Sequence, residues 1–301
     1  MKILISGASG LVGTALTSAL RADGHRVAHF VRAGSAQAEG DVGWDPAKGL
    51  VDLAAMEAVQ AVVCLNGASI ARGRWTKPRK KVLADSRIQP ARILVQSFEK
   101  LKQKPRVFLC ASAIGFYGNR GDQILTEASE GGTDFLSDVC RQWEAEAMQA
   151  QGRGIRTACL RFGVVLSIRG GALQRMLTPF KMGVGGRLGD GRQWMSWVAL
   201  DDAVGSVRFM IENESFSGPV NIVSPRPVQN AEFTRVLASI LHRPAILPAP
   251  AFALRLALGE LADALLLASQ RVEPERLGAA GYPFRFNHVE PALRAAIMNQ
   301  M

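Results

Sequence analysis

The first thirteen residues constrain the fold more than any other part of the chain. Residues 2–6 form a short apolar run with the pattern of a buried strand, and residues 14–21 carry apolar side chains at helical spacing. Between them lies the stretch Gly7-Ala8-Ser9-Gly10-Leu11-Val12-Gly13, with a glycine at every third position. A strand, a glycine-rich turn and a helix in this order are the context in which a glycine motif binds a dinucleotide.

Each glycine of this motif has a physical role beside a pyrophosphate. Gly7 lets the strand turn sharply, Gly10 lets backbone approach the phosphates, and Gly13 lets the helix pack closely on the strand. The helix N-terminus adds free N–H groups and a partial positive charge. The alternative, a plain tight turn, does not explain the flanking strand and helix. We therefore predict cofactor contacts at Gly7, Ser9, Gly10, Leu11, Val12 and Gly13.

The end of the second expected strand, residues 25–32, indicates which cofactor is bound. An acidic residue there would bind the ribose hydroxyls and favour NAD. This chain instead has Val31 and Arg32. A guanidinium matches a phosphate in shape and charge, and a charge-assisted hydrogen bond of about 1.5–3 kcal/mol gives roughly tenfold or greater preference. We predict NADP(H), with Val31 and Arg32 as contacts; the alternative is an arginine that only faces water.

The alternation of later segments predicts an α/β fold with a doubly wound parallel sheet of Rossmann type. Ligands of such sheets lie outside the carboxyl ends of the strands, so Leu65 and Asn66 are expected on the adenine-ribose side of the cofactor. From about residue 166 the alternation loosens. We assign residues 1–225 to the Rossmann domain, with inserted parts of a substrate lobe after about 166, and 226–301 to a smaller, mostly helical C-terminal lobe. Strands are expected at 41–46, 61–68, 106–112, 156–161 and 220–223, and helices at 77–101, 134–149 and from 203, capped by Asp201 or Asp202.

Composition narrows the classes of partner. The chain has 301 residues, 48% hydrophobic content and a net charge of +10. The apolar stretch 252–269 holds three charged residues, so we expect a packed helix and no membrane span. With no signal peptide apparent, we expect a cytoplasmic protein.

Six basic residues lie within residues 72–81, but no nucleic-acid motif accompanies them, which favours a solvated helix face over nucleic-acid binding. The four cysteines form no paired motif, so we predict no metal site.

Characteristic stretches occur along the chain: the Gly7–Gly13 motif, Arg74-Trp75, Ser86-Arg87, 112–118, Trp143-Glu144, 161–166, Ser196-Trp197, Asp201-Asp202, Asn221, Pro225, 269–272 and Pro274. With these stretches the chain resembles the extended short-chain dehydrogenase/reductase superfamily, which includes the nucleotide-sugar epimerases. Within it, the chain is similar to an atypical subgroup called epimerase-family proteins, sometimes described as cell-division inhibitors. The resemblance runs nearly end to end. It implies bound NADP(H), a C-terminal lobe over the nicotinamide, and cofactor contacts from Arg32, Leu65, Asn66, Arg87 and Val164.

The catalytic residues depart from this superfamily. Its chemistry uses a Tyr-x-x-x-Lys pair, in which the lysine lowers the pKa of the tyrosine so that the phenol can transfer protons near neutrality. If Glu144 is aligned with the acid that commonly follows the pair, Leu136 stands in place of the tyrosine and Cys140 in place of the lysine. The serine that positions the substrate oxygen falls on Ser112 or Ala113, depending on a one-residue choice of register.

Tyr117 and Ser112 are the remaining candidates for catalysis. Tyr117 is one of two tyrosines and follows the fifth strand, where substrate would lie. It fits a proton donor, but also a packing residue whose hydroxyl is bound to backbone, because an unactivated phenol titrates near pH 10. Asp201 or Glu144 could act as base, although a helix cap or an ion pair explains each equally well.

Two functions fit these observations. The first is an NADP(H)-dependent oxidoreductase or nucleoside-diphosphate-sugar epimerase that acts on an unknown small molecule, which the basic charge allows to be nucleotide-linked. The second is a catalytically inactive protein that senses NADP(H) and regulates a partner. The sequence leaves the oligomeric state open, a homodimer included.

Overall fold

One parallel sheet forms the centre of the protein. The computed structural model describes residues 1–32 and 38–298. The strand order is β12-β8-β6-β5-β1-β2-β3-β4, and every pairing is parallel except that of β3 with β4. The chain starts in the middle and builds outward in both directions, so the crevice between β1 and β5 is the expected ligand position. The strands are β1 Lys2–Ser6, β2 Arg26–Arg32, β3 Val42–Asp45, β4 Leu50–Val51, β5 Ala61–Cys64, β6 Val107–Ala113, β8 Arg156–Phe162 and β12 Gly218–Ile222.

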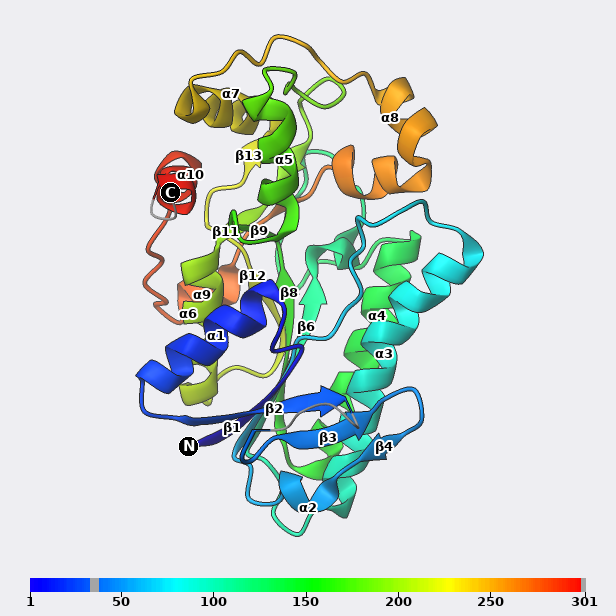
Figure 1. Cartoon of the computed structure of the whole chain (residues 1–301), viewed down its shortest axis with the longest axis vertical. Helices are drawn as coiled ribbons and strands as arrows, with labels where there is room; N and C mark the ends of the chain where they lie inside the picture. Colours follow the sequence, from blue (N-terminus) through cyan, green and yellow to red (C-terminus); the bar gives the residue numbers. More distant parts are fainter. Residues whose placement is uncertain (33–37, 299–301) are drawn as a thin grey trace.

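Helices cover both faces of this sheet, which confirms the predicted doubly wound α/β fold (Figure 1). Helices α1 (Leu11–Ala22) and α6 (Leu200–Glu212) pack on one face, while α3 (Lys77–Lys100) and α4 (Phe135–Met148) pack on the other. The short helix α2 spans Leu53–Met56. Helix α3 continues through Pro90.

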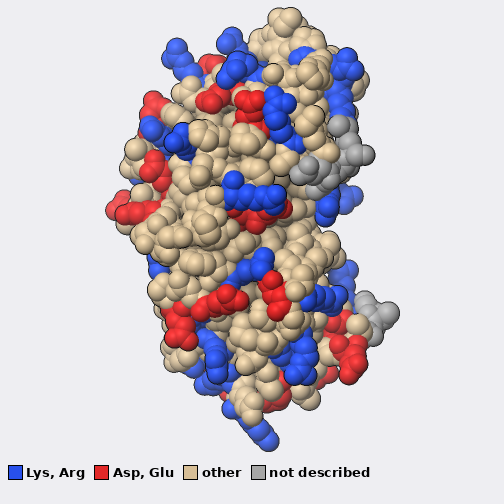
Figure 2. Space-filling model, turned by 90° about the vertical axis from the view of Figure 1, so that its left-hand side faces the viewer, with Lys and Arg blue, Asp and Glu red and all other residues tan. Residues whose placement is uncertain are grey.

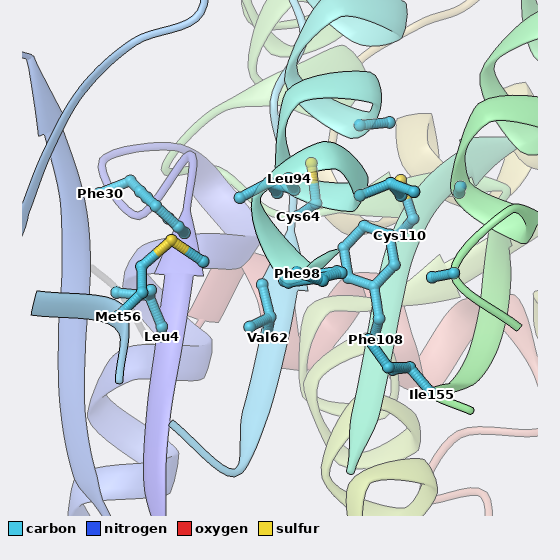
Figure 3. Packing of buried hydrophobic residues seen from close by; sticks show 14 of the residues in the cluster. Leu4, Phe30, Met56, Val62, Cys64, Leu94, Phe98, Phe108, Cys110 and Ile155 are labelled. Carbon is cyan, nitrogen blue, oxygen red and sulfur yellow. The ribbon is translucent and has the colours of Figure 1, made fainter. Parts of the chain in front are cut away.

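Alternate residues of each strand serve the two faces, as the strand period requires. Ile3 and Ile5 of β1 face α1 and α6, whereas Leu4 between them faces α3 and α4. On the α3 side, Cys64 of β5 and Cys110 of β6 lie side by side in register, in the same cluster of buried residues as Phe98 (Figure 3). All four cysteines are free and buried.

Side-chain caps fix where several helices begin. Thr76 accepts a hydrogen bond from the backbone N–H of Arg79 at the start of α3, and Asp134 accepts one from Ser137 at the start of α4. The prediction for α6 was wrong. This helix begins at Leu200 instead of residue 203, so Asp201 and Asp202 lie in its first turn and do not cap it.

A second lobe stands above the carboxyl ends of the strands (Figure 1). Its core combines segments on both sides of residue 226, with Trp197 and Leu173 packed among residues of α7 and α10. Its elements are β9 Val164–Leu166, α5 Gly171–Lys181, β10 Trp194–Met195, β11 Trp197–Ala199, β13 Val228–Gln229, α7 Asn230–Leu241, α8 Ala251–Leu258, η3 Ala262–Leu266 and α10 Val289–Met298. The remaining short elements are η1 Ile114–Tyr117, β7 Ile124–Leu125, η2 Gln151–Arg153, β14 Arg271–Val272 and α9 Glu275–Ala279.

Helix α8 differs from the packed helix that we predicted. None of its residues is buried, and Phe252 and Leu256 are 72% and 77% exposed. In the part of the chain that the structure describes, no helix is long and apolar enough to cross a membrane.

Charged residues of both signs are interspersed over the face shown in Figure 2. The basic cluster at residues 72–81 is partly engaged within the chain. Lys80 pairs with Glu260 at 2.5 Å, Lys81 pairs with Asp85 at 2.5 Å, and Arg74 donates to the carbonyl of Ala257 at 3.2 Å. The contacts of Lys80 and Arg74 join the region around the start of α3 to the region around the end of α8, whereas that of Lys81 lies within α3.

Candidate cofactor and substrate site

The glycine loop is built from contacts that leave no room for side chains. Gly7 has a φ of +71°, and a Cβ added there would lie 2.7 Å from the carbonyl oxygen of Leu65. A Cβ on Gly13 would overlap the carbonyl oxygen of Gly7. Gly10, the residue before α1, donates its N–H to that same oxygen at 3.0 Å. The bare loop and the helix N-terminus form a cradle that fits a pyrophosphate.

Other predicted cofactor contacts gather around this loop. Leu65 continues from β5, and its N–H donates to the carbonyl of Ser6 at 3.0 Å, so Leu65 and Asn66 border Gly7. Val164 begins β9 and is half-buried. Shortly after β9, the backbone of Gly170 approaches the side chain of Leu11. The loop after β1, the loop after β5 and the segment after β9 therefore meet at one end of the sheet.

Val31 and Arg32 lie at the carboxyl end of β2, beside β1 in the sheet. Val31 is half-buried and in register with Gly43, and Arg32 is exposed and in register with Trp44. Arg32 therefore lies at the same edge of the sheet as the glycine loop. A dinucleotide in the cradle would extend its adenosine half toward this strand.

Arg87 reaches from α3 to the loop after β5. Its guanidinium donates to the carbonyl oxygens of Leu83 at 2.9 Å and Ala68 at 3.0 Å. It also lies against Gly67, where an added Cβ would be 3.1 Å from its Cζ. The ring of Trp143 lies 5.7 Å from the same atom. Arg87 is therefore held at the carboxyl end of β5 from the α3 side.

Helix α4 carries the two residues that stand in place of the usual catalytic pair. Leu136 packs beside Gly115 of η1, where an added Cβ would lie 3.4 Å from its own Cβ. Cys140 donates its thiol to the carbonyl of Ala113 at 3.8 Å. Burial, reinforced by the negative charge of Glu144, raises the pKa of the Cys140 thiol to about 12. Leu136 has no proton to give, and Cys140 keeps its own near neutrality.

Ser112 faces α4, where its hydroxyl binds a carboxylate that belongs to a buried ion pair. Its hydroxyl donates to Oε1 of Glu144 at 2.6 Å, and Arg161 donates to both carboxylate oxygens of Glu144 at 2.8 Å. Burial alone would lower the pKa of Arg161, but the bonds to Glu144 raise it above its usual value. Ala113, the other register choice, has no hydroxyl. Asp201, which was considered as a base, forms a surface ion pair with Arg285 at 2.6 Å.

Tyr117 lies on the other side of Arg161 and is fully buried. Its hydroxyl donates to Oδ1 of Asn221 at 2.7 Å and accepts a bond from Arg161 at 2.9 Å. Burial raises the pKa of Tyr117 above its usual value, although the charge of Arg161 opposes this rise. This environment favours the packing interpretation over the proton donor, with side chains and not backbone as partners.

The extent of this network was not predicted. Asn221 also donates its backbone N–H to Glu127, a contact that joins positions 94 residues apart. The sequence around Glu127, Ser112 and Glu144 does not indicate these bonds, because the partners are distant in the chain and meet only in the folded protein. The sequence feature that could have indicated this network is a single polar residue within an apolar strand, as at Arg161 and Asn221.

Comparison with known proteins identifies the family to which this chain belongs. A model of the NAD dependent epimerase/dehydratase family matches residues 3–223, and the chain belongs to that family. Residues 249–296 match a domain of unknown function, DUF1731. The resemblance drawn from the motifs is thus confirmed.

Named relatives span nearly the whole chain. Epimerase family protein ML0860 of Mycobacterium leprae is 42% identical over 98% of this chain and 95% of its own length. An Arabidopsis thaliana relative, the chloroplastic epimerase family protein SDR39U1 homolog, is 37% identical over 98% of this chain and 86% of its own. The crystal structure of human epimerase family protein SDR39U1 (isoform 2) with NADPH has a TM-score of 0.90 and 32% identity, covering 99% of this chain and 100% of that one.

Proposed function

We propose that this protein is an NADP(H)-dependent oxidoreductase that exchanges a hydride with a small molecule. The proposal rests on the glycine cradle at the centre of the sheet, where a side chain at Gly7 or Gly13 would clash with backbone atoms. The NADPH in the structure of its human relative supports the choice of cofactor. When bound, NADPH supplies a hydride, and the protein supplies position and charge.

The proposed contacts divide by their place on the sheet edge. The loop from Gly7 to Gly13 holds the pyrophosphate, and Leu65 and Asn66 border the adenine-ribose side. Arg32, at the end of β2, binds the 2′-phosphate that distinguishes NADP from NAD. Val164 and Arg87 contact the cofactor from β9 and α3.

The surrounding residues fit hydride transfer better than sugar epimerisation. An epimerase that oxidises a sugar hydroxyl needs a base within hydrogen-bond distance of that hydroxyl. Ser112 already donates its proton to Glu144, and both oxygens of Glu144 are bound by Arg161. Leu136 and Cys140 offer no base near neutral pH. These side chains favour a reaction that removes no proton from a substrate hydroxyl.

Two further assignments accompany this proposal. The chain's net charge of +10 favours an anionic, nucleotide-linked substrate. We keep the cytoplasm as the proposed compartment, although the Arabidopsis relative is named as chloroplastic. The second candidate function, a regulator that binds NADP(H) without turnover, rests on Leu136 and Cys140 in the catalytic positions.

The test begins with titrations of NADPH and NADH into the wild type and R32A. We expect NADPH to bind at least about tenfold more tightly, and R32A to remove most of that preference. The matched control is R26A, since Arg26 is exposed at the opposite end of β2 and its loss changes the charge equally. An unchanged preference in R32A would refute the role of Arg32.

Turnover is then tested with NADPH deuterated at the transferable position. The labelled cofactor is incubated with the protein and a small-molecule extract, and products are analysed by mass spectrometry. We expect protein-dependent deuterium in a product. Tight NADPH binding with no labelled product from any fraction would favour the regulator.

A further inference from the structure

Exposed apolar side chains gather at the end of the second lobe that lies away from the sheet. Eleven large apolar residues are exposed in the part of the chain that the structure describes, and six of them fall within residues 182–184 and 246–256. These six are Met182, Val184, Ile246, Leu247, Phe252 and Leu256. Single exposed apolar residues are common on soluble proteins, whereas a group of this size marks a surface that contacts an apolar partner.

The two stretches form one surface. The loop after α5 and the loop between α7 and α8 run side by side at the upper end of the molecule (Figure 1). Ala249 donates its N–H to the carbonyl of Arg187 at 2.9 Å, and Gly189 donates to the carbonyl of Ala249 at 2.9 Å. We call this surface, residues 181–192 and 243–256, the apolar tip.

Helix α8 presents its largest side chains away from the protein. Phe252 and Leu256 are four residues apart, so they share one face of the helix, and both are mostly exposed. Arg74 holds the end of the helix, because its guanidinium donates to the carbonyl oxygens of Leu256 and Ala257. The exposed face of α8 is therefore held in place by contacts with the rest of the fold.

The charges on the apolar tip are almost all positive. Five basic residues and a single acidic residue lie within it. The basic residues are Lys181, Arg187, Arg192, Arg243 and Arg255, and the acidic residue is Asp190. Arg255 pairs with Asp263 at 2.9 Å, whereas the other four are exposed and form no salt bridge within residues 1–32 and 38–298. Four unpaired cations thus lie beside six exposed apolar side chains.

We propose that the apolar tip binds the surface of a membrane that contains anionic lipids. The unpaired cations attract the lipid headgroups, and the apolar side chains insert at the boundary between headgroups and acyl chains. A second copy of this chain fits less well, because two tips would bring their positive charges together. The inference does not rest on the proposed hydride transfer, since no residue of the tip is assigned to the cofactor.

The test is flotation of the purified full chain with lipid vesicles. One set of vesicles is pure phosphatidylcholine, and the other is an equal mixture of phosphatidylcholine and phosphatidylglycerol, which is anionic. We expect the wild type to bind the anionic vesicles at least about tenfold more tightly than the neutral ones, since each basic residue near such a surface contributes about fivefold. High salt should weaken this binding, because it screens the headgroup charges.

The apolar contribution is measured with F252S/L256S. We expect this variant to bind anionic vesicles at least about tenfold more weakly than the wild type, because it loses two inserting side chains. The matched control is L50S/M298S, which replaces two exposed apolar residues outside the tip and should bind like the wild type. Unchanged NADPH affinity in both variants shows that they fold.

The charge contribution is measured with R187Q/R243Q, for which we also expect at least about tenfold weaker binding to anionic vesicles. The control K104Q/R106Q removes two exposed charges just before β6, at the end of the sheet away from the second lobe, and should bind like the wild type. An equal loss in this control would overturn the proposal, since the effect would then reflect net charge alone.

Three further results would contradict a membrane as the partner. The first is no flotation of the wild type with anionic vesicles. The second is binding that R187Q/R243Q loses and F252S/L256S keeps, which would indicate a surface for a soluble acidic protein. The third is a dimer in light scattering that F252S/L256S converts to a monomer, because the tip would then be an interface between two copies of this chain.

Discussion

Arg161 joins side chains from four parts of the chain at the carboxyl edge of the sheet. It pairs with Glu144, donates to Tyr117, and lies 3.5 Å from the ring centre of Phe116. Such a buried network is stable only when all its members are bonded, so it holds β6, β8, η1 and α4 in one arrangement. Individual residues were predictable where the signal is local, as for the glycines. The partners of Arg161 were not, because their contacts depend on how strands pair.

Replacing Tyr117 by phenylalanine tests whether its hydroxyl is structural. The change leaves Oδ1 of Asn221 and one donor of Arg161 without their partner, so we expect a loss of about 1–3 kcal/mol in the free energy of unfolding. Hydride transfer per folded molecule should be unchanged. Urea denaturation measures the first quantity and NADPH oxidation the second. A loss of turnover at unchanged stability would restore Tyr117 as a proton donor; Y282F, at the half-buried second tyrosine, is the control.

Glu127 should make stability depend on pH. Its Oε1 accepts the N–H of Asn221 at 2.9 Å, while its Oε2 has no partner in the described part of the chain. Burial raises the pKa of Glu127 above its usual 4.5, despite opposing backbone hydrogen bonds and the charge of Arg276. The folded state therefore holds this proton more tightly than the unfolded state. The resulting stabilisation is complete below pH 4.5 and is lost as the pH rises through the folded-state pKa.

The variant E127Q cannot titrate and reveals this contribution. From pH 4 to pH 7, the free energy of unfolding of E127Q minus that of the wild type should increase, by at most about 1.4 kcal/mol per pH unit. Denaturation of both proteins at several pH values measures the difference. A difference that stays constant over this range would show that Glu127 keeps an ordinary pKa.

At the scale of elements, the turn from β1 into α1 was the most predictable part of the site. Strand, turn and helix are adjacent in sequence, so spacing alone fixes their order and the glycine positions. Helices α3 and α4 were predicted to within a residue, and the structure shows that Thr76 and Asp134 cap them. At α6 the predicted cap was wrong. Asp202 accepts the N–H groups of Arg285 and Phe286, a distant segment, and so is not a cap.

The variant G13A tests how closely α1 must approach the glycine loop. An added Cβ would overlap the carbonyl oxygen of Gly7, so the helix or the loop must move. We expect a loss of about 1–3 kcal/mol in stability and at least tenfold weaker NADPH binding. The control is G152A, where an added Cβ meets nothing within 4 Å. Wild-type NADPH affinity in G13A would show that the cofactor does not use this turn.

At the scale of the whole molecule, the core of the second lobe is built from segments on both sides of residue 226. Trp197 and Leu173, from before residue 226, are fully buried against α7 and α10, from after it. Composition and alternation predicted the sheet and a lobe that does not separate cleanly. They did not predict that α8 would leave Phe252 and Leu256 exposed, because an apolar run alone does not show what covers it.

A chain that ends at residue 225 tests this shared core. Removing α7 and α10 would expose Leu166, Leu173 and Trp197 to water, so we expect a truncated chain that aggregates or unfolds without a cooperative transition. Thermal denaturation followed by circular dichroism measures this. If residues 1–225 fold cooperatively and bind NADPH with full affinity, the C-terminal lobe is an independent unit.

The most direct test of the central claim is single-turnover hydride transfer at different pH values. NADPH-loaded protein is mixed with a small-molecule extract between pH 6 and 9, and the loss of the reduced nicotinamide signal is followed with normal and deuterated cofactor. We expect a rate that changes less than about twofold with pH and slows severalfold with deuterium, because no protein group gives or takes a proton during the transfer. NADPH that stays bound and unoxidised, or a rate that follows one ionising group, would contradict the account.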